Sequence, residues 1–126
     1  MRNKILILVL AILLIAILGL SIAGYFQSSK EESKGKVTLK TTVLGSSTEK
    51  TYEFENLTAL DLLQKDNKVN LTFSSYGAFV QCINGICSNN NYYWMYYVNS
   101  ELAAVGADAY RIKNNDTIEF RYDKVM

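Results

Sequence analysis

Two cysteines carry the sharpest chemical signal in this sequence. Cys82 and Cys87 lie on either side of Asn84-Gly85, a residue pair that strongly favours a two-residue β-hairpin turn. In such a hairpin the cysteines face each other with Cα atoms about 4.5 Å apart, which a disulfide can bridge. Two reduced, half-buried thiols are the alternative, and a compartment outside the cytoplasm favours the disulfide. The spacing differs from the C-x-x-C motif of redox enzymes.

Residue types that commonly support catalysis or metal binding are sparse. The chain has no His, the commonest general base and metal ligand. Asp61, Asp66, Asp108 and Asp116 are spread over cap and turn positions and form no carboxylate pair suited to acid/base chemistry. Two cysteines without a histidine make a poor zinc site. We therefore expect no catalytic residues, no metal site and no enzymatic activity.

A dense run of aromatic residues is the second signal. If residues 92–98 form a strand, successive side chains point to opposite faces. Tyr92, Trp94 and Tyr96 then share one face, and Tyr93, Met95 and Tyr97 share the other. One face can belong to the core, and the second then meets a ligand, a partner or another part of the chain. A core role alone and a binding surface are equally compatible with this pattern.

The elements that position these residues follow from turn signals and periodicity. Residues 36–44 and 48–54 are rich in β-branched or alternating residues and predict a hairpin. Thr58 and Asp61 have capping-box spacing at the start of a short amphipathic helix over 58–64. The other predicted strands cover residues 69–73, 79–82, 86–87, 92–98 and 117–122. This order predicts an α+β fold, a β-grasp-like mixed sheet with one short helix packed across it.

The N-terminal segment predicts membrane attachment. Residues 5–26 contain no charged residue and as a helix span roughly 30 Å, the thickness of the bilayer core. Arg2 and Lys4 precede the segment and predict a cytoplasmic N-terminal end. A cleavable signal peptide is the alternative, because Ser21-Ile22-Ala23 resembles a cleavage site, but the apolar stretch exceeds the usual length of about 7–15 residues. We therefore expect one transmembrane helix in a single-pass cell-membrane protein with an extracytoplasmic C-terminal domain.

The chain thus divides into three predicted parts. Residues 1–26 form the transmembrane anchor with its short cytoplasmic end, 27–36 a polar tether and 37–126 the folded domain. Basic and acidic residues nearly balance in the domain, so we expect no nucleic-acid partner. Three matches to the glycosylation sequon begin at residues 56, 70 and 115, and such matches are common by chance in a chain rich in Asn, Ser and Thr.

Several motifs, in this order, resemble those of one known family. They are SSYGAFV over 74–80, INGIC over 83–87, the Tyr93-Trp94 pair, VGADAY over 105–110 and NDTIEFRY over 115–122. Residues from about 37 to 122 resemble the C-terminal β-domain of the cobalamin carriers intrinsic factor, haptocorrin and transcobalamin, and the prokaryotic transcobalamin-like C-terminal domains. The resemblance implies the same β-grasp-like fold.

The resemblance also implies a set of ligand contacts. In the carriers, cobalamin lies between a large helical domain and this β-domain. Carried over by matching motif, the contact residues are Tyr76, Gly77, Phe79, Val80, Tyr93, Trp94 and Tyr96. The sequence departs from the carriers at Tyr76, where they tend to have Trp, and at Ala78, where they have Pro, and it contains no counterpart of the helical domain.

Two functional hypotheses follow. The first is a membrane-anchored extracytoplasmic module that binds a cobalamin-like corrinoid and passes it to a transporter or another surface protein. Cobalamin is then a ligand, and no covalently bound cofactor is expected. The second hypothesis is a cell-surface adhesion or protein-interaction domain that uses the same fold, because a fold does not fix a function.

Overall fold

The computed structural model of this 126-residue chain describes residues 2–13 and 33–125. The chain separates into two compact units, Met1–Glu31 and Glu32–Met126. In the first unit, residues 2–13 are helical and their side chains are exposed. No helix in the described parts of the chain is both long and apolar enough to cross a membrane. Residues 14–32, which include much of the predicted anchor and tether, lie outside the described residues.

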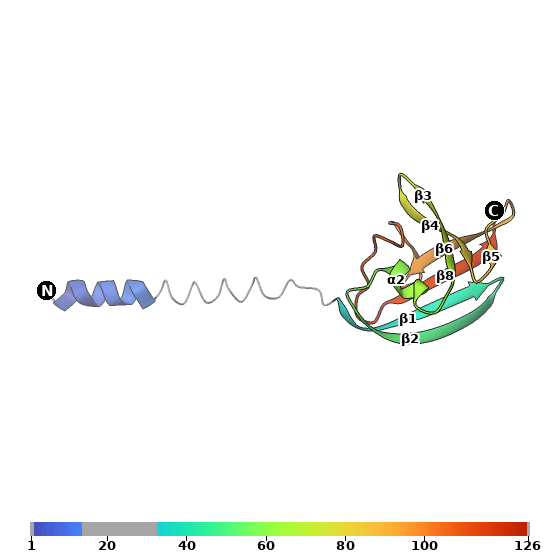
Figure 1. Ribbon diagram of the computed structural model, residues 1–126. Helices are drawn as coiled ribbons and strands as arrows, with labels where there is room; N and C mark the ends of the chain where they lie inside the picture. Colours follow the sequence, from blue (N-terminus) through green and yellow to red (C-terminus); the bar gives the residue numbers. More distant parts are fainter. Residues whose placement is uncertain (1, 14–32, 126) are drawn as a thin grey trace. The chain divides into compact units, whose positions relative to one another are not determined.

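The main sheet has five strands in the order β2-β1-β8-β6-β7 (Figure 1). These strands are β1 (Lys34–Val43), β2 (Ser46–Glu55), β6 (Tyr92–Val98), β7 (Glu101–Leu102) and β8 (Thr117–Lys124). The first and last strands, β1 and β8, lie side by side and parallel at the centre, and the other pairs are antiparallel. β1 begins at Lys34, three residues before the expected start of the domain.

A second sheet has three strands, β3 (Val69–Ser74), β4 (Gly77–Ile83) and β5 (Ile86–Cys87), in the order β3-β4-β5. The hairpin of β3 and β4 extends away from the main sheet in Figure 1. The sequence predicted strands in these places but not their separation into a second sheet. Local patterns set which residues form a strand, whereas pairing between strands depends on tertiary contacts.

The predicted helix is confirmed as α2 (Ala59–Gln64). Thr58 is its N-cap, and its side-chain oxygen accepts a hydrogen bond of 3.1 Å from the backbone N–H of Asp61. The Asp61 carboxylate accepts one of 3.0 Å from the backbone N–H of Thr58. This reciprocal pair satisfies two amides that would otherwise lack partners at the helix start.

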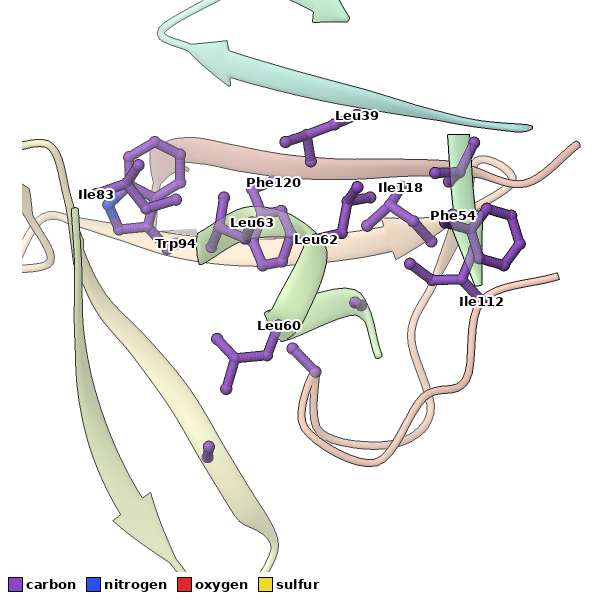
Figure 2. Close-up of a cluster of buried hydrophobic side chains, with 14 of the residues drawn as sticks. Leu39, Phe54, Leu60, Leu62, Leu63, Ile83, Trp94, Ile112, Ile118 and Phe120 are labelled. Carbon is purple, nitrogen blue, oxygen red and sulfur yellow. The ribbon is translucent and has the colours of Figure 1, made fainter. Parts of the chain in front are cut away.

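The hydrophobic core lies between α2 and one face of the main sheet. Figure 2 shows Leu62 and Leu63 of α2 among apolar side chains of the strands. The side chains of Leu62, Leu63, Ile112, Ile118 and Phe120 are almost fully buried. Burial of each such side chain stabilises the fold by about 1.5–3 kcal/mol. The mixed α+β class, mostly sheet with one short helix, is thus confirmed.

Candidate functional site

The cysteine hairpin forms as predicted. Cys82 and Cys87 are bonded as a disulfide with Cα atoms 4.0 Å apart, and they are direct partners in the β4–β5 register. Asn84 and Gly85 have positive φ angles of 50° and 84°, as a type I′ turn requires at its two central positions. The disulfide reading is therefore confirmed, and the alternative of two free thiols is wrong for this structure.

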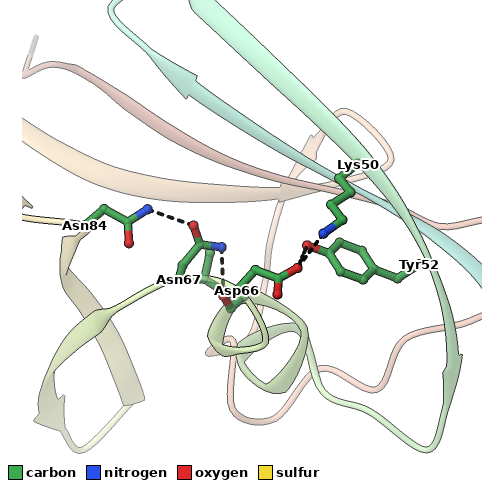
Figure 3. Close-up of polar contacts among 6 residues, drawn as sticks. Lys50, Tyr52, Asp66, Asn67 and Asn84 are labelled. Carbon is green, nitrogen blue, oxygen red and sulfur yellow. Dashed lines mark hydrogen bonds and ion pairs between the residues drawn. The ribbon is translucent and has the colours of Figure 1, made fainter.

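A polar network holds the turn of this hairpin to the segment that follows α2 (Figure 3). The Asn84 amide nitrogen donates to the Asn67 side-chain oxygen at 2.9 Å, and its oxygen accepts from the backbone N–H of Lys68 at 2.8 Å. Beside it, the Asp66 carboxylate accepts hydrogen bonds of 2.7 Å from both Lys50 and Tyr52 of β2. The hairpin turn is thus fixed to the body of the domain independently of the disulfide.

An apolar cavity of about 240 Å³ opens between β4, β6 and the loop that follows β7. We call it the β4–β6 pocket. Its walls come from three segments and from β8 beneath them. The lining residues are Tyr76, Ala78, Phe79, Val80, Trp94, Met95, Tyr96, Leu102, Ala103, Ala104, Val105, Gly106, Ala107 and Phe120.

The pocket has a buried floor and an exposed rim. Trp94 and Phe120 in the floor are 8% and 1% exposed and belong to the core. On the rim, Tyr76 is 85% exposed and Phe79 is 52% exposed. Large apolar side chains in open solvent are available to bury surface against another molecule. Because Tyr76 and Phe79 are largely exposed, either side chain can be truncated without opening a cavity in the core.

The structure brings five of the seven expected contact residues together around this pocket: Tyr76, Phe79, Val80, Trp94 and Tyr96. Gly77 and Tyr93 do not line it. Gly77 has a φ of 114° at the start of β4, a conformation that favours glycine, and a Cβ there would lie 3.1 Å from the Asp108 carboxylate. Tyr93 points to the opposite face of β6, where its register partner is Asp123.

The second aromatic face of β6 meets another part of the chain. The Arg121 guanidinium lies over the ring of Tyr97, 4.1 Å from its centroid. Arg121 also pairs with Glu119 at 2.8 Å, and the Thr42 hydroxyl donates to the same carboxylate at 2.6 Å. The hydrogen bonds from Arg121 and Thr42 lower the pKa of Glu119, although burial opposes this. This face is thus covered at Tyr97 by a cation–π contact.

Sequence reasoning missed the wall formed by residues 103–107. Asp108, which follows it, ties this loop to β4 because its carboxylate accepts a hydrogen bond of 3.3 Å from the backbone N–H of Ala78. A Cβ at Gly106 would lie 2.6 Å from the same carboxylate oxygen, so a larger residue there would have to displace the Asp108 side chain. The run of small apolar residues from Ala103 to Ala107, without helical or strand periodicity, was the available signal.

Tyr96 joins the floor to this wall. Its ring stacks on Phe120 with centroids 5.4 Å apart, and its hydroxyl donates to the backbone carbonyl of Val105. Burial and, to a smaller extent, the nearby Asp108 carboxylate raise the pKa of Tyr96 to about 12. Tyr96 therefore keeps its proton at neutral pH and holds the wall as a hydrogen-bond donor.

The pocket and its surroundings carry very little charge. Residues 69–100, which contain β3 to β6, include no Asp, Glu, Lys or Arg. In the described ranges, 2–13 and 33–125, no group of three or more His, Cys, Asp or Glu side chains could hold a metal ion. The surface thus suits a neutral, partly apolar molecule more than an ion.

Comparison with known proteins places this architecture in a family. Residues 56–124 match the model of DUF4430, described as a domain of unknown function. The chain belongs to the DUF4430 family. The matched region contains the whole β4–β6 pocket and the disulfide, whereas β1 and β2 precede it.

The DUF4430 domain is also similar to proteins with more informative names. Human Transcobalamin-1 is 32% identical over 86 residues, which cover 56% of this chain and 20% of that protein. The chain thus spans about a fifth of the length of this relative. The resemblance to the transcobalamin-like domain family noted from the motifs is confirmed.

Two solved structures share the fold. Haptocorrin in complex with Cbi superposes with a TM-score of 0.62 at 21% identity, covering 73% of this chain and 26% of that one. A protein from Ruminococcus gnavus described as a candidate metal binding protein superposes with a TM-score of 0.65 at 14% identity, covering 73% of this chain and 99% of the other. At these identities the similarity shows the fold alone.

Proposed function

We propose that this chain is a membrane-anchored, extracytoplasmic module whose DUF4430 domain binds a flat, largely uncharged amphipathic molecule such as a cobalamin-like corrinoid. The observation that carries the proposal is the β4–β6 pocket, where exposed rings at Tyr76 and Phe79 surround a buried aromatic floor. Such a surface favours a planar ligand, because a flat molecule can bury area against several rings at once. The similarity to Transcobalamin-1 and to haptocorrin in complex with Cbi supports the corrinoid class.

The size of the pocket sets the mode of binding. Its volume of about 240 Å³ is below the range of roughly 300–1,000 Å³ typical of sites that enclose a ligand. A corrinoid would therefore insert an edge and rest its face on the rim. Contact on one side leaves much of the ligand in water, so the isolated module should bind no tighter than roughly micromolar. Weak retention suits a module that hands its ligand to a transporter or to a second binding domain.

The lining favours binding over catalysis. Among the described residues that line the pocket, Tyr76 and Tyr96 are the ones with ionisable side chains. The Tyr96 hydroxyl donates a hydrogen bond to the carbonyl of Val105 and keeps its proton. Catalysis of proton transfer requires a group whose pKa is matched to the reaction, and the raised pKa of Tyr96 moves this side chain away from such a role at neutral pH.

The proposal is tested by titrating the full chain, purified in detergent, with cobalamin and with cobinamide. Binding is followed by the corrin absorption band at constant protein concentration. A saturable change with a Kd of roughly micromolar or weaker supports the proposal. Absence of any saturable change for both corrinoids, with the domain shown to be folded by far-UV circular dichroism, would refute the corrinoid class.

A second function, adhesion or protein interaction, is favoured by one specific observation. Phe73 is 78% exposed on the same hairpin as Tyr76 and Phe79, yet it does not line the pocket. The exposed aromatic surface therefore extends beyond the cavity, as a broad protein or glycan interface would require. In this case Phe73→Ala reduces adhesion of cells that display the chain, whereas corrinoid binding at the pocket is unaffected by the same change.

A further inference from the structure

The second strand of the disulfide hairpin is bonded to the floor of the β4–β6 pocket. The indole N–H of Trp94 donates to the backbone carbonyl of Ile86 at 2.8 Å, and Trp94 is 8% exposed. The hydroxyl of Tyr122 donates to the next carbonyl, that of Cys87, at 2.9 Å. Two successive backbone carbonyls of β5 thus accept hydrogen bonds from two aromatic side chains of the main sheet.

These two aromatic residues also contact each other. Trp94 and Tyr122 are register partners on β6 and β8, and their ring centroids are 5.1 Å apart. The backbone N–H of Trp94 donates to the hydroxyl of Ser88, the residue that follows β5, at 3.0 Å. The position and tilt of the Trp94 ring therefore depend on where residues 86–88 lie.

β5 itself has little burial to hold it. It is two residues long, Ile86 is 37% exposed, and Cys87 is also exposed. The polar network at Asn84 fixes the turn before β5, but it does not reach Cys87. The far end of the strand is held to β4 by the covalent link from Cys87 to the buried Cys82, and beyond it by two hydrogen bonds of 2.8 and 3.2 Å between Ser88 and Gln81. Without the covalent link, this exposed two-residue strand would depend on a few hydrogen bonds and should separate from β4 more readily.

We propose that the Cys82–Cys87 disulfide is a positioning element of the pocket: it fixes the carbonyls of β5, these hold Trp94 in the floor, and reduction of the disulfide weakens ligand binding. This inference rests on the proposed function for its ligand. The disulfide acts through Trp94 and does not touch the ligand. Because Cys87 is exposed, the bond is open to thiols in solution.

The redox step is thiol–disulfide exchange with a dithiol. A thiolate of the dithiol attacks the sulfur of Cys87, the protein S–S bond breaks, and Cys82 leaves as a thiolate that takes a proton. The second thiol of the reagent then attacks the mixed disulfide and releases Cys87. Two electrons and two protons pass to the protein, which ends with two thiols, and the reagent ends as a cyclic disulfide.

Reduction should change the pocket because a buried N–H would lose its acceptor. When β5 separates from β4, the indole of Trp94 turns toward water or another acceptor, since an unsatisfied buried donor is costly. The Trp94 ring then no longer keeps the position in the floor that suits a ligand resting on the rim. We expect cobinamide to bind about tenfold more weakly to the reduced chain.

The test uses the full chain before and after treatment with dithiothreitol. Trp94 is the sole tryptophan of the chain, so its fluorescence reports this site directly. Reduction should shift its emission to longer wavelength, increase quenching by acrylamide and weaken cobinamide binding, while far-UV circular dichroism stays unchanged. The double variant Cys82→Ser with Cys87→Ser should reproduce the reduced state and no longer respond to the dithiol.

A matched variant isolates the indole hydrogen bond. Trp94→Phe keeps an aromatic ring in the floor but has no N–H, so most of the effect of reduction on cobinamide affinity should disappear in it. Equal quenching of Trp94 and equal Kd in oxidised and reduced chains would overturn the proposal. Global unfolding of the reduced chain would also overturn it, because the disulfide would then be a general stabiliser.

These outcomes separate the inference from the proposed function. If the oxidised chain fails to bind cobinamide, the proposed function loses its ligand. The quenching of Trp94 needs no ligand and still decides whether the disulfide positions this side chain.

Discussion

Replacement of Tyr76 by Ala should weaken ligand binding while it leaves the fold intact. Tyr76 is 85% exposed at the turn between β3 and β4, and the rest of its side chain touches the pocket rim. Its backbone N–H donates to the Ser74 hydroxyl at 3.1 Å, a bond that the substitution preserves. Truncation of such an exposed side chain opens no core cavity, so the free energy of unfolding should change by no more than about 0.5 kcal/mol.

The loss of affinity follows from the area of the ring. A buried aromatic side chain removes about 150–250 Å² from water, and a flat ligand that covers one ring face buries roughly 80 Å² of it. At about 25 cal/mol per Å² this contact stabilises the complex by about 2 kcal/mol. Tyr76→Ala should therefore raise the Kd for cobinamide about 30-fold.

The assay is a titration followed by the corrin absorption band, with a urea unfolding curve recorded for each variant. Phe73→Ala is the matched control, because Phe73 is an exposed ring on the same hairpin that does not line the pocket. The control should retain the wild-type Kd. Equal affinity of wild type and Tyr76→Ala would refute the reasoning, and an equal loss in both variants would favour a broad interaction surface over the pocket.

Four further predictions concern the fold and its attachment. Trp94→Ala should lower the free energy of unfolding by about 3–5 kcal/mol, seen as a lower urea midpoint, because the ring is buried in the core; an unchanged midpoint would contradict its place there. Thr58→Ala should cost about 1 kcal/mol through loss of the helix cap, and thermal unfolding would show it as a lower Tm, whereas Thr38→Ala, outside any cap, is the control. The pKa of Glu119 is held below its ordinary value of 4.5, so its ionised form stabilises the fold above that pH and the contribution is lost as pH falls through the lower, folded value. Glu119→Gln should therefore flatten the decline of Tm between about pH 5 and pH 2, and an equally steep decline would argue against it. Finally, the chain should remain in the membrane fraction and lose its domain to external protease, whereas a mature N-terminus at Gly24 would indicate a cleaved signal.

Local chemistry was sufficient to predict most elements of this domain, but not the two-residue strand β7. The Asn84-Gly85 turn set the hairpin register, and that register placed the two cysteines opposite each other. The capping box at Thr58 and Asp61 set the helix start. Each of these features depends on residues a few positions apart, where sequence spacing and spatial distance are nearly the same.

The candidate site was predictable only in part. Motif resemblance pointed to Tyr76, Phe79 and Trp94, which the structure gathers around one pocket. It also pointed to Tyr93, which alternation along β6 places on the other face. The resemblance matches positions in a chain, whereas the face on which a side chain lies depends on the pleat of the strand.

The sequence by itself thus determined the strands other than β7, the capped helix, the disulfide and the aromatic character of this domain. Tertiary structure decided which aromatic face became pocket and which was covered by Arg121, which loop closed the wall, and that β5 would hold Trp94. The physical reason is the range of the interactions. Turns, caps and a hairpin disulfide are fixed by neighbours in sequence, but a pocket wall forms between segments far apart in the chain, whose meeting depends on the packing of the whole core.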